Sequence, residues 1–404
     1  MAEILEREGY RVKLKVEVPA AEVNRAYEAV VREYAGKVRI PGFRPGKAPA
    51  KVIEARLGRE SLLEEVKERL LDTSYPKAVK ELELLPVGVK LLEAHLERGQ
   101  PFTYVAEVEN YPEVKLPDWR GFKLEVPPIE VTDEMVEQAL QDLRTRYGEL
   151  VPVERPIEAK DQVFIETEDG ARFPIDMEKA LEHVREALLG KSTGDEVMVP
   201  VKDGDAVVKE LKTKVLEVKA LQLPELDEEF AKTVGEESLE VLRGKVRMSL
   251  EAQAARTVQE AKAQQLLQRL ADGLEAEIPP TMLNHEQQHL LEHLAEDLQK
   301  EGTTLQDYLK GLEDQGKLEE FRTDLKTSAE GRIRRALAKE KLQEELGTEL
   351  SEEEWEAYLA EMARAYRTNP ASLKKELGEE SLERLRVQRL QDKALAEALQ
   401  KLEG

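Results

Sequence analysis

The chain has 404 residues, of which 36% are charged, 41% are hydrophobic and only 5% are aromatic. The absence of cysteine excludes a disulfide framework and a thiolate metal site. No apolar run approaches the ~20 residues that a membrane span needs, and the N-terminus lacks the apolar segment of a signal peptide. Length and composition therefore predict a soluble, cytoplasmic protein of about two or three domains, rich in long helices.

Charge is distributed unevenly along the chain, although the net charge of −23 argues against nonspecific binding of nucleic acid. Residues 1–112 hold 19 Lys and Arg against 19 Asp and Glu, so the net acidity lies beyond residue 112. Residues 31–59 contain eight basic residues and only two acidic ones, Glu33 and Glu54. Such a local basic patch indicates a directed contact with phosphate, and a solvated basic surface is the alternative.

The first part of the chain alternates between two kinds of periodicity. Apolar residues recur at every second position in three segments, which is typical of half-buried strands, and with helical spacing in three others. The order of a strand, helices and two strands predicts an α+β domain that ends near residue 112. Strands are predicted at residues 10–18, 87–97 and 102–109, and helices at 20–37, 50–57 and 60–84.

Residues 42–49 read Gly-Phe-Arg-Pro-Gly-Lys-Ala-Pro and lie between two of the predicted helices. The prolines restrict φ and the glycines permit tight turns between them. This composition makes a poor core segment, and it predicts an exposed loop tip that presents Phe43 together with the cations Arg44 and Lys47. Such a tip suits a polyanionic surface that also offers an apolar contact, such as structured RNA beside protein. An ordinary Pro/Gly connection is the alternative.

Beyond residue 112, proline-bearing extended chain leads to Thr132, which we expect to cap a helix that runs to about residue 147. Residues 149–223 contain short Val/Ile-rich runs and several glycines, so we expect a small β-rich domain with one helix at about 177–189. From residue 224 onward the pattern is almost wholly helical. Helices are predicted at 236–274, 281–300, 304–312, 317–346, 351–367, 370–377 and 379–402.

These C-terminal helices are long and charged, with apolar stripes of Leu, Ala and Met and few aromatic residues. A long helix must bury its stripe against a partner helix, another copy or a client. Internal packing is the default expectation. A concave apolar surface for flexible partners is the alternative.

Residues 42–49 resemble the G-F-R-x-G-K-x-P signature of trigger factor, the family of bacterial ribosome-associated chaperones, at every specified position. Pro45 stands where a more basic residue is common in the family. Val-Thr-Asp-Glu at 131–134, the segment at 223–230 and Ile-Pro-Pro at 278–280 are also similar to the family's sequences. The resemblance therefore extends over essentially the whole chain.

The resemblance implies an ATP-independent chaperone that needs no cofactor and no membrane. By carry-over, Phe43, Arg44 and Lys47 contact protein and RNA of the large ribosomal subunit beside the exit tunnel, and Gly42 and Gly46 shape the tip. The resemblance also implies a cradle for unfolded nascent chains and a homodimer away from the ribosome. The implied fold is α+β and multidomain: a ribosome-binding domain (1–112), an extended linker and helix (113–148), a reduced FKBP-like domain (149–223) and an elongated all-α substrate-binding domain with arms (224–404).

The family also carries peptidyl-prolyl cis-trans isomerase activity in its FKBP-like domain, where aromatic residues hold the proline ring. Here residues 163–167 replace the family's V-x-I-D-F run, with Glu in place of the Asp and Thr in place of the Phe. Residues 149–223 contain no Trp or Tyr and only two Phe. We therefore expect the fold without the activity, and a functional isomerase is the alternative. The candidate remnants of the pocket are Phe164, Glu166, Phe173 and Leu188.

Residues 285–289 match H-E-x-x-H, the motif in which two histidines bind zinc and the glutamate activates water. His293 lies one further helical turn along. On a helix, however, His285 and His293 are about 12 Å apart along the axis, too far to share one metal ion. We expect solvated histidines, with His285 and His289 as adventitious metal ligands at most. A zinc metalloprotease is the remote alternative.

Overall fold

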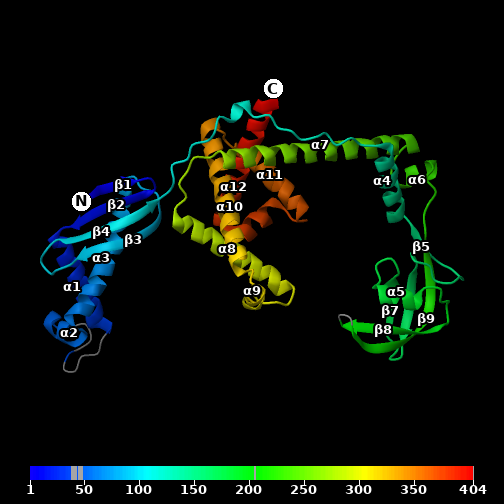
Figure 1. Ribbon diagram of the computed structural model, residues 1–404, viewed down its shortest axis with the longest axis horizontal. Helices are drawn as coiled ribbons and strands as arrows, with labels where there is room; N and C mark the ends of the chain where they lie inside the picture. The colour runs from blue at the N-terminus through cyan, green and yellow to red at the C-terminus, as the bar shows by residue number, and fades with distance from the viewer. Residues whose placement is uncertain (38–42, 44–48, 204–205, 404) are drawn as a thin grey trace. The chain divides into compact units, whose positions relative to one another are not determined.

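The computed structural model describes residues 1–37, 43, 49–203 and 206–403. Its helices and sheets confirm the predicted mixture of α+β, β-rich and helical regions (Figure 1). The chain forms two compact units, one built from residues 1–125 and 262–404 and the other from 126–261. The bounds of the four domains drawn from the sequence stay a prediction. Among the described helices, none combines the length and the apolar composition that a bilayer span requires.

A four-stranded antiparallel sheet opens the first unit, with the strand order β1-β2-β4-β3. Alternate residues of the two central strands, such as Leu14 and Tyr104, are buried under the helices. β1 was not predicted, because as an edge strand it buries almost none of its residues. The elements are β1 (Ala2–Glu8), β2 (Arg11–Val18), α1 (Ala20–Lys37), α2 (Ala50–Leu57), α3 (Arg59–Glu81), β3 (Pro86–His95) and β4 (Phe102–Asn110).

Helices α1 and α3 cover one face of this sheet (Figure 1). In α1 the buried residues Val23, Tyr27 and Val30 recur at the spacing that the sequence predicted. In α3, Leu62 and Val66 enter the same core. The predicted helices at 20–37 and 50–57 have the bounds that the structure shows, because their periodicity reflects one apolar face turned to one core.

The second unit begins with α4 (Asp133–Arg146), whose first turn is capped by Thr132 as predicted, since its hydroxyl accepts from the Met135 amide at 3.3 Å. A five-stranded antiparallel sheet follows, in which β9 pairs with β5, β6 and β8, and β6 also pairs with β7. These elements are β5 (Glu149–Pro152), β6 (Gln162–Thr167), β7 (Arg172–Asp176), α5 (Glu182–Leu188), β8 (Glu196–Asp203) and β9 (Ala206–Gln222).

The helix predicted at about 177–189 is too long at its start, because α5 begins only at Glu182. The guanidinium of Arg185 donates to the carbonyls of Met177, Glu178 and Ala180 at 3.0–3.1 Å. These carbonyls accept hydrogen bonds from a side chain instead of from the backbone amides of a helix. The segment before α5 can therefore stay non-helical without leaving them unpaired.

The same unit contains α6 (Glu228–Thr233), which was not predicted, and the first part of α7 (Leu239–Asp272). Asp227 caps α6 by accepting from the amides of Glu229 and Phe230. Gly235 has φ +88 and lies between the two helices. The helix predicted from residue 236 therefore starts three residues later, after a turn that glycine permits.

The rest of α7 enters the first unit and packs with the C-terminal helices. One core gathers Leu270 of α7, Leu342 of α10, Leu399 of α12 and Trp119 of the short η1 helix (Trp119–Gly121). Gly378 interrupts α12 with φ 73 and ψ 167, at the break predicted between residues 377 and 379. The helices are α8 (Pro280–Lys300), α9 (Leu305–Asp314), α10 (Leu318–Leu346), α11 (Glu352–Ala365) and α12 (Pro370–Glu403).

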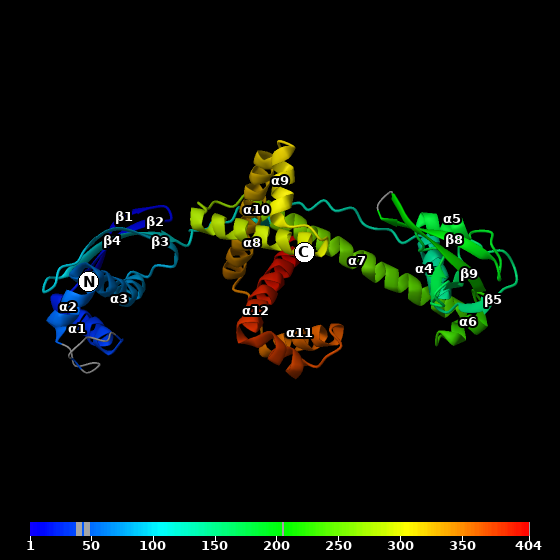
Figure 2. The ribbon, with the colours of Figure 1, turned by 90° about the horizontal axis from the view of Figure 1, so that it is seen from below.

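A capping box fixes the start of α11, which lies beside the first part of α12 (Figure 2). The Ser351 hydroxyl accepts from the Glu354 amide, and the Glu354 carboxylate accepts from the Ser351 amide. The ammonium of Lys393 on α12 donates to the same carboxylate at 2.7 Å. Lys393 and then Ser351 lower the pKa of Glu354 from 4.5 to about 2.

Candidate functional site

The segment with the signature connects two helix ends that the structure describes: α1 ends at Lys37 and α2 begins at Ala50. Phe43 is 42% exposed and belongs to none of the hydrophobic cores. A large aromatic side chain left partly in water is available for an apolar contact. The other predicted docking residues, Gly42, Arg44, Gly46 and Lys47, lie outside the described residues.

Four of the eight cations counted in the basic patch are exposed and form no ion pair or hydrogen bond with any described residue. They come from all three helices around the segment: Arg32 from α1, Lys51 and Arg56 from α2, and Arg59 from the start of α3. A cation without a protein partner keeps its full charge for an anionic ligand. Arg39 lies outside the described residues together with the loop cations.

Both carboxylates of the patch are engaged by cations. Glu33 accepts from Lys37 at 2.5 Å and from Arg69 at 2.6 Å, and these contacts, with Lys37 first, lower its pKa. Glu54 accepts from Arg98 at 2.8 Å. Arg69 and Arg98 lie outside residues 31–59, so the structure supplies positive charge that the sequence window did not include.

A second feature is the helical arm formed by α8, α9 and the first half of α10. Figure 2 shows α9 beside these two helices, and the ring of Tyr308 meets that of Phe321 edge-on at 6.1 Å. α9 buries none of its residues. Eight apolar residues of the arm are half-buried and belong to none of the five hydrophobic cores: Leu290, Leu291, Leu294, Leu305, Tyr308, Leu309, Phe321 and Leu325.

These half-buried residues determine what the arm is able to do chemically. Each leaves apolar area in contact with water, which several weak contacts with a flexible chain would cover. Leu side chains make non-directional apolar contacts and can therefore bind ligands of different sequence and shape. The arm therefore suits an unfolded polypeptide better than a small molecule.

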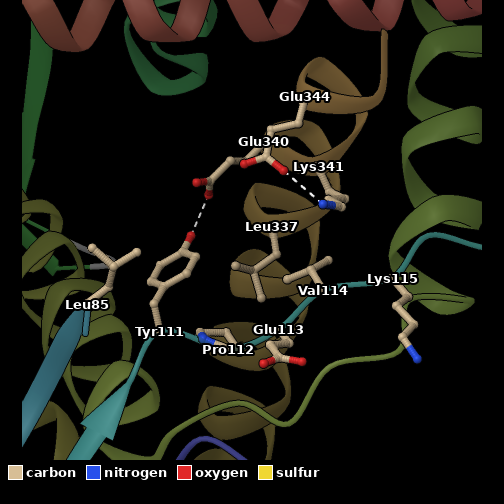
Figure 3. A pocket seen from close by; sticks show the side chains of 10 residues that line it. All are labelled: Leu85, Tyr111, Pro112, Glu113, Val114, Lys115, Leu337, Glu340, Lys341 and Glu344. Atoms are coloured by element: carbon tan, nitrogen blue, oxygen red, sulfur yellow. Dashed lines mark hydrogen bonds and ion pairs between the residues drawn. The ribbon is translucent and has the colours of Figure 1, made fainter. Parts of the chain in front are cut away.

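Figure 3 shows how the end of β4 meets α10 within the first unit. The Tyr111 hydroxyl donates to Glu340, and burial, followed by this hydrogen bond, raises the pKa of Tyr111. The Thr281 amide donates to Glu109 at 3.0 Å. Leu337 and Tyr111 line the cavity of about 370 Å³ drawn in the figure. No sequence motif indicated this junction, because its partners are far apart in the chain.

The candidate remnants of an isomerase pocket do not share one face of their sheet. Phe173 lies opposite Ile165 in the β6–β7 register, on the core face, but at the sheet edge, where it is 50% exposed. Phe164 and Glu166 alternate with the buried residues of β6 and therefore point to the other face. Leu188 is fully buried within the core. No single hollow receives all of these side chains.

The face that bears Phe164 is polar. Charges of alternating sign cross four strands there, with Arg172 paired to Glu166, Glu166 opposite Lys214, and Lys214 opposite Glu196. The ammonium of Lys219 lies 4.9 Å from the ring centre of Phe164. A charged, solvated face does not desolvate a prolyl peptide bond, which is what catalysis of its rotation requires.

The H-E-x-x-H histidines lie on α8 without the geometry of a zinc site. Glu286, which would activate water, instead pairs with Arg332 at 3.4 Å. The rings of His289 and His293 are 4.8 Å apart edge-on, and His285 lines a hollow with Ile333 of α10. Within the described part of the chain, no group of three or more His, Asp or Glu is arranged to hold a metal ion. The metalloprotease alternative thus has no support.

Comparison with known proteins assigns the chain to a family. A family model for "Bacterial trigger factor protein (TF)" matches residues 1–143, and one for "Bacterial trigger factor protein (TF) C-terminus" matches residues 238–400. The chain is 60% identical over 403 residues to trigger factor of Thermus thermophilus, covering 100% of both proteins. It is 40% identical over 411 residues to that of Deinococcus deserti, covering 100% of this chain and 94% of the relative.

A solved structure from a study of "Promiscuous Substrate Recognition in Folding and Assembly Activities of the Trigger Factor Chaperone" matches with a TM-score of 0.66 and 27% identity, over 100% of both chains. Sequence and fold therefore agree along the whole length. The chain belongs to the trigger factor family of ribosome-associated folding chaperones.

Proposed function

We propose that the chain docks beside the exit tunnel of the large ribosomal subunit through Phe43, Arg44 and Lys47, on a tip shaped by Gly42 and Gly46. The observation that carries this proposal is the exposed ring of Phe43, together with the four exposed cations of α1, α2 and α3 that form no ion pair or hydrogen bond with a described residue. Phe43 supplies apolar area, Arg44 a bidentate phosphate ligand and Lys47 a mobile charge.

The domain assignment follows from the same proposal. Residues 1–112 bind the ribosome, residues 113–148 link the domains, residues 149–223 form the reduced FKBP-like domain and residues 224–404 bind substrate. Docking places the half-buried apolar residues of the α8–α10 arm where unfolded nascent chains emerge, in the cytoplasm. The same apolar area supports a homodimer when no ribosome is bound.

Co-sedimentation with purified, non-translating 70S ribosomes tests the docking. The full chain with Phe43→Ala, Arg44→Ala and Lys47→Ala is expected to lose most of its binding, with the largest loss at low salt, because ions screen phosphate contacts. Ribosomes without a nascent chain exclude binding through a client. Equal sedimentation of wild type and variant would refute the docking.

A matched control removes the same kinds of side chain from an exposed site far along the chain. Tyr366, Arg364 and Lys375 are exposed and form no ion pair with a described residue. Their simultaneous replacement by Ala removes one ring and two cations, as the loop variant does. We expect this control to sediment with ribosomes as wild type does, which separates the loop from general charge.

We propose further that residues 149–223 do not act as a prolyl isomerase. The support is the placement of Phe164 and Phe173 on opposite faces, together with the charged surface around Phe164. The test is a refolding reaction limited by prolyl isomerisation, with the full chain added at catalytic amounts. We expect no acceleration beyond that of a Phe164→Ala/Phe173→Ala variant. Clear acceleration by wild type alone would restore the isomerase alternative.

A further inference from the structure

Two clusters of polar side chains hold the helices on either side of the segment that connects α1 to α2. One cluster lies at Glu54, in the second turn of the eight-residue helix α2, and the other lies in the last turn of α1. Each contains a tyrosine hydroxyl donating to a carboxylate, and each includes an arginine from outside the segment. We call them the α2 clamp (Tyr27, Glu54, Arg98) and the α1 clamp (Glu33, Tyr34, Lys37, Glu65, Arg69).

In the α2 clamp, one carboxylate oxygen receives two donors. The Tyr27 hydroxyl of α1 lies 2.6 Å from Glu54 Oε1, and Arg98 Nη1, from the turn between β3 and β4, lies 2.8 Å from the same atom. The Arg98 guanidinium also lies 4.4 Å from the ring centre of Tyr27. Burial and then Glu54 raise the pKa of Tyr27 to about 12, so the hydroxyl remains a donor. The helix α1, the β3–β4 turn and α2 thus meet at the Glu54 carboxylate.

In the α1 clamp, the last turns of α1 are tied to α3. Glu33 accepts from Lys37 on its own helix and from Arg69 of α3, while the Tyr34 hydroxyl donates to Glu65 of α3 at 3.0 Å. Hydrogen bonds to a charged partner are stronger than neutral ones and fix geometry more closely. The end of α1 is therefore held against α3 by charge-assisted contacts from both sides.

The geometry points to Tyr27, Glu54, Glu33 and Tyr34 as positioning residues for ribosome docking. They hold α2 and the end of α1, the two helices between which the docking tip is presented. This inference rests on the proposed function of the tip. A bound contact requires its groups in fixed places, and ordering them before binding lowers the entropic cost of binding. None of the four residues needs to touch the ribosome for this role.

For Glu33 and Glu54, the positioning role and electrostatics alone predict opposite changes in ribosome affinity when the carboxylate is removed. Both are carboxylates within a basic surface that faces phosphate. If charge alone mattered, removal of either would strengthen binding, because it removes repulsion of the RNA. If the carboxylates position the helix ends, the same removal weakens binding. The direction of the change therefore decides between the two roles.

The experiment measures the dissociation constant of the full chain for purified, non-translating 70S ribosomes. Tyr27→Phe/Tyr34→Phe leaves the net charge and both rings unchanged and removes only the two hydroxyl donors. We expect it to bind about threefold to tenfold more weakly, as the loss of two modest hydrogen bonds predicts. Glu54→Ala is expected to bind more weakly as well, despite the lost negative charge.

Two further variants complete the comparison. In Glu54→Gln the amide oxygen still accepts from Tyr27 and Arg98, so we expect affinity near that of wild type. Glu28 is exposed on α1 and forms no ion pair or hydrogen bond with a described residue, so Glu28→Ala is the matched removal of a carboxylate outside the clamps. It is expected to bind as well as wild type or slightly more tightly.

The outcomes separate the inference from the proposed function. The loop variant carries Phe43→Ala, Arg44→Ala and Lys47→Ala. If it loses binding but Glu54→Ala and Glu54→Gln both bind more tightly, the positioning role is overturned. Unchanged binding by Tyr27→Phe/Tyr34→Phe would overturn it as well. If the loop variant itself binds normally, the proposed docking fails first. The double tyrosine variant keeps both aromatic rings, so a folded sample, verified by its thermal transition, is available even where Glu54→Ala destabilises α2.

Discussion

A methyl group at position 88 tests how closely the N-terminal sheet is held against α8. Gly88 lies in β3, and a Cβ atom added there would lie 2.6 Å from Thr281 Oγ1, 3.1 Å from its Cβ and 3.3 Å from its Cγ2. Rotation of the threonine moves Oγ1 and Cγ2 but leaves its Cβ at 3.1 Å, which is still closer than ordinary contact. Gly88→Ala therefore forces β3 and the start of α8 apart.

The size of the effect follows from these distances. Ordinary contact begins at 3.4 Å, so the two side chains must separate by 3.4 − 2.6 = 0.8 Å if the threonine keeps its rotamer, and by 3.4 − 3.1 = 0.3 Å if it rotates. Overpacking of this kind costs about 2 kcal/mol, which shifts an equilibrium between closed and open junctions roughly thirtyfold. The Tyr111–Glu340 and Thr281–Glu109 hydrogen bonds of the junction would be lost in the open state.

The absence of cysteine permits a clean assay, since two introduced cysteines accept dyes at defined places. Gln100→Cys, in the β3–β4 turn, and Gln315→Cys, between α9 and α10, are both exposed. The measurement is the efficiency of resonance energy transfer between the two dyes in single molecules. We expect Gly88→Ala to broaden the distribution of this efficiency and to shift its mean.

Thr281→Ala provides the rescue, because it removes Oγ1 and Cγ2 but keeps the backbone amide that donates to Glu109. The double variant Gly88→Ala/Thr281→Ala is therefore expected to recover most of the wild-type distribution. An unchanged distribution in Gly88→Ala alone would refute the argument that this contact holds the sheet against α8.

Three further predictions concern stability. Leu337→Ala empties a site in the helical core that is only 1% exposed, and should cost about 2–5 kcal/mol in urea denaturation. Arg155→Ala leaves the buried Asp161 carboxylate without its bidentate partner, so protease should cut residues 149–223 faster in this variant than in Arg172→Ala, whose ion pair is exposed. Glu354→Gln should loosen α11 in hydrogen exchange at pH 7; because the folded pKa of about 2 lies below 4.5, the difference from wild type should fade as pH drops from 4.5 toward 2.

Features that depend only on neighbouring residues could be predicted from the sequence. The apolar periodicity of α1, the Thr132 cap and the break at Gly378 all arise within one or two turns of chain, and each lies where it was predicted. The signature at residues 42–49 is local as well, and the family that it indicated is confirmed by comparison over the full length. The roles of its individual residues stay a prediction.

Contacts between distant residues, in contrast, are visible only in the folded chain. Tyr111 meets Glu340 across 229 positions and Glu54 meets Arg98 across 44, and no periodicity encodes such pairs. The alternation of β6 was visible in the sequence, but its register with β7, which places Phe164 and Phe173 on opposite faces, is set by how the strands pair. Local patterns thus indicated what the docking tip presents, while packing decided which side chains hold the helix ends on either side of it.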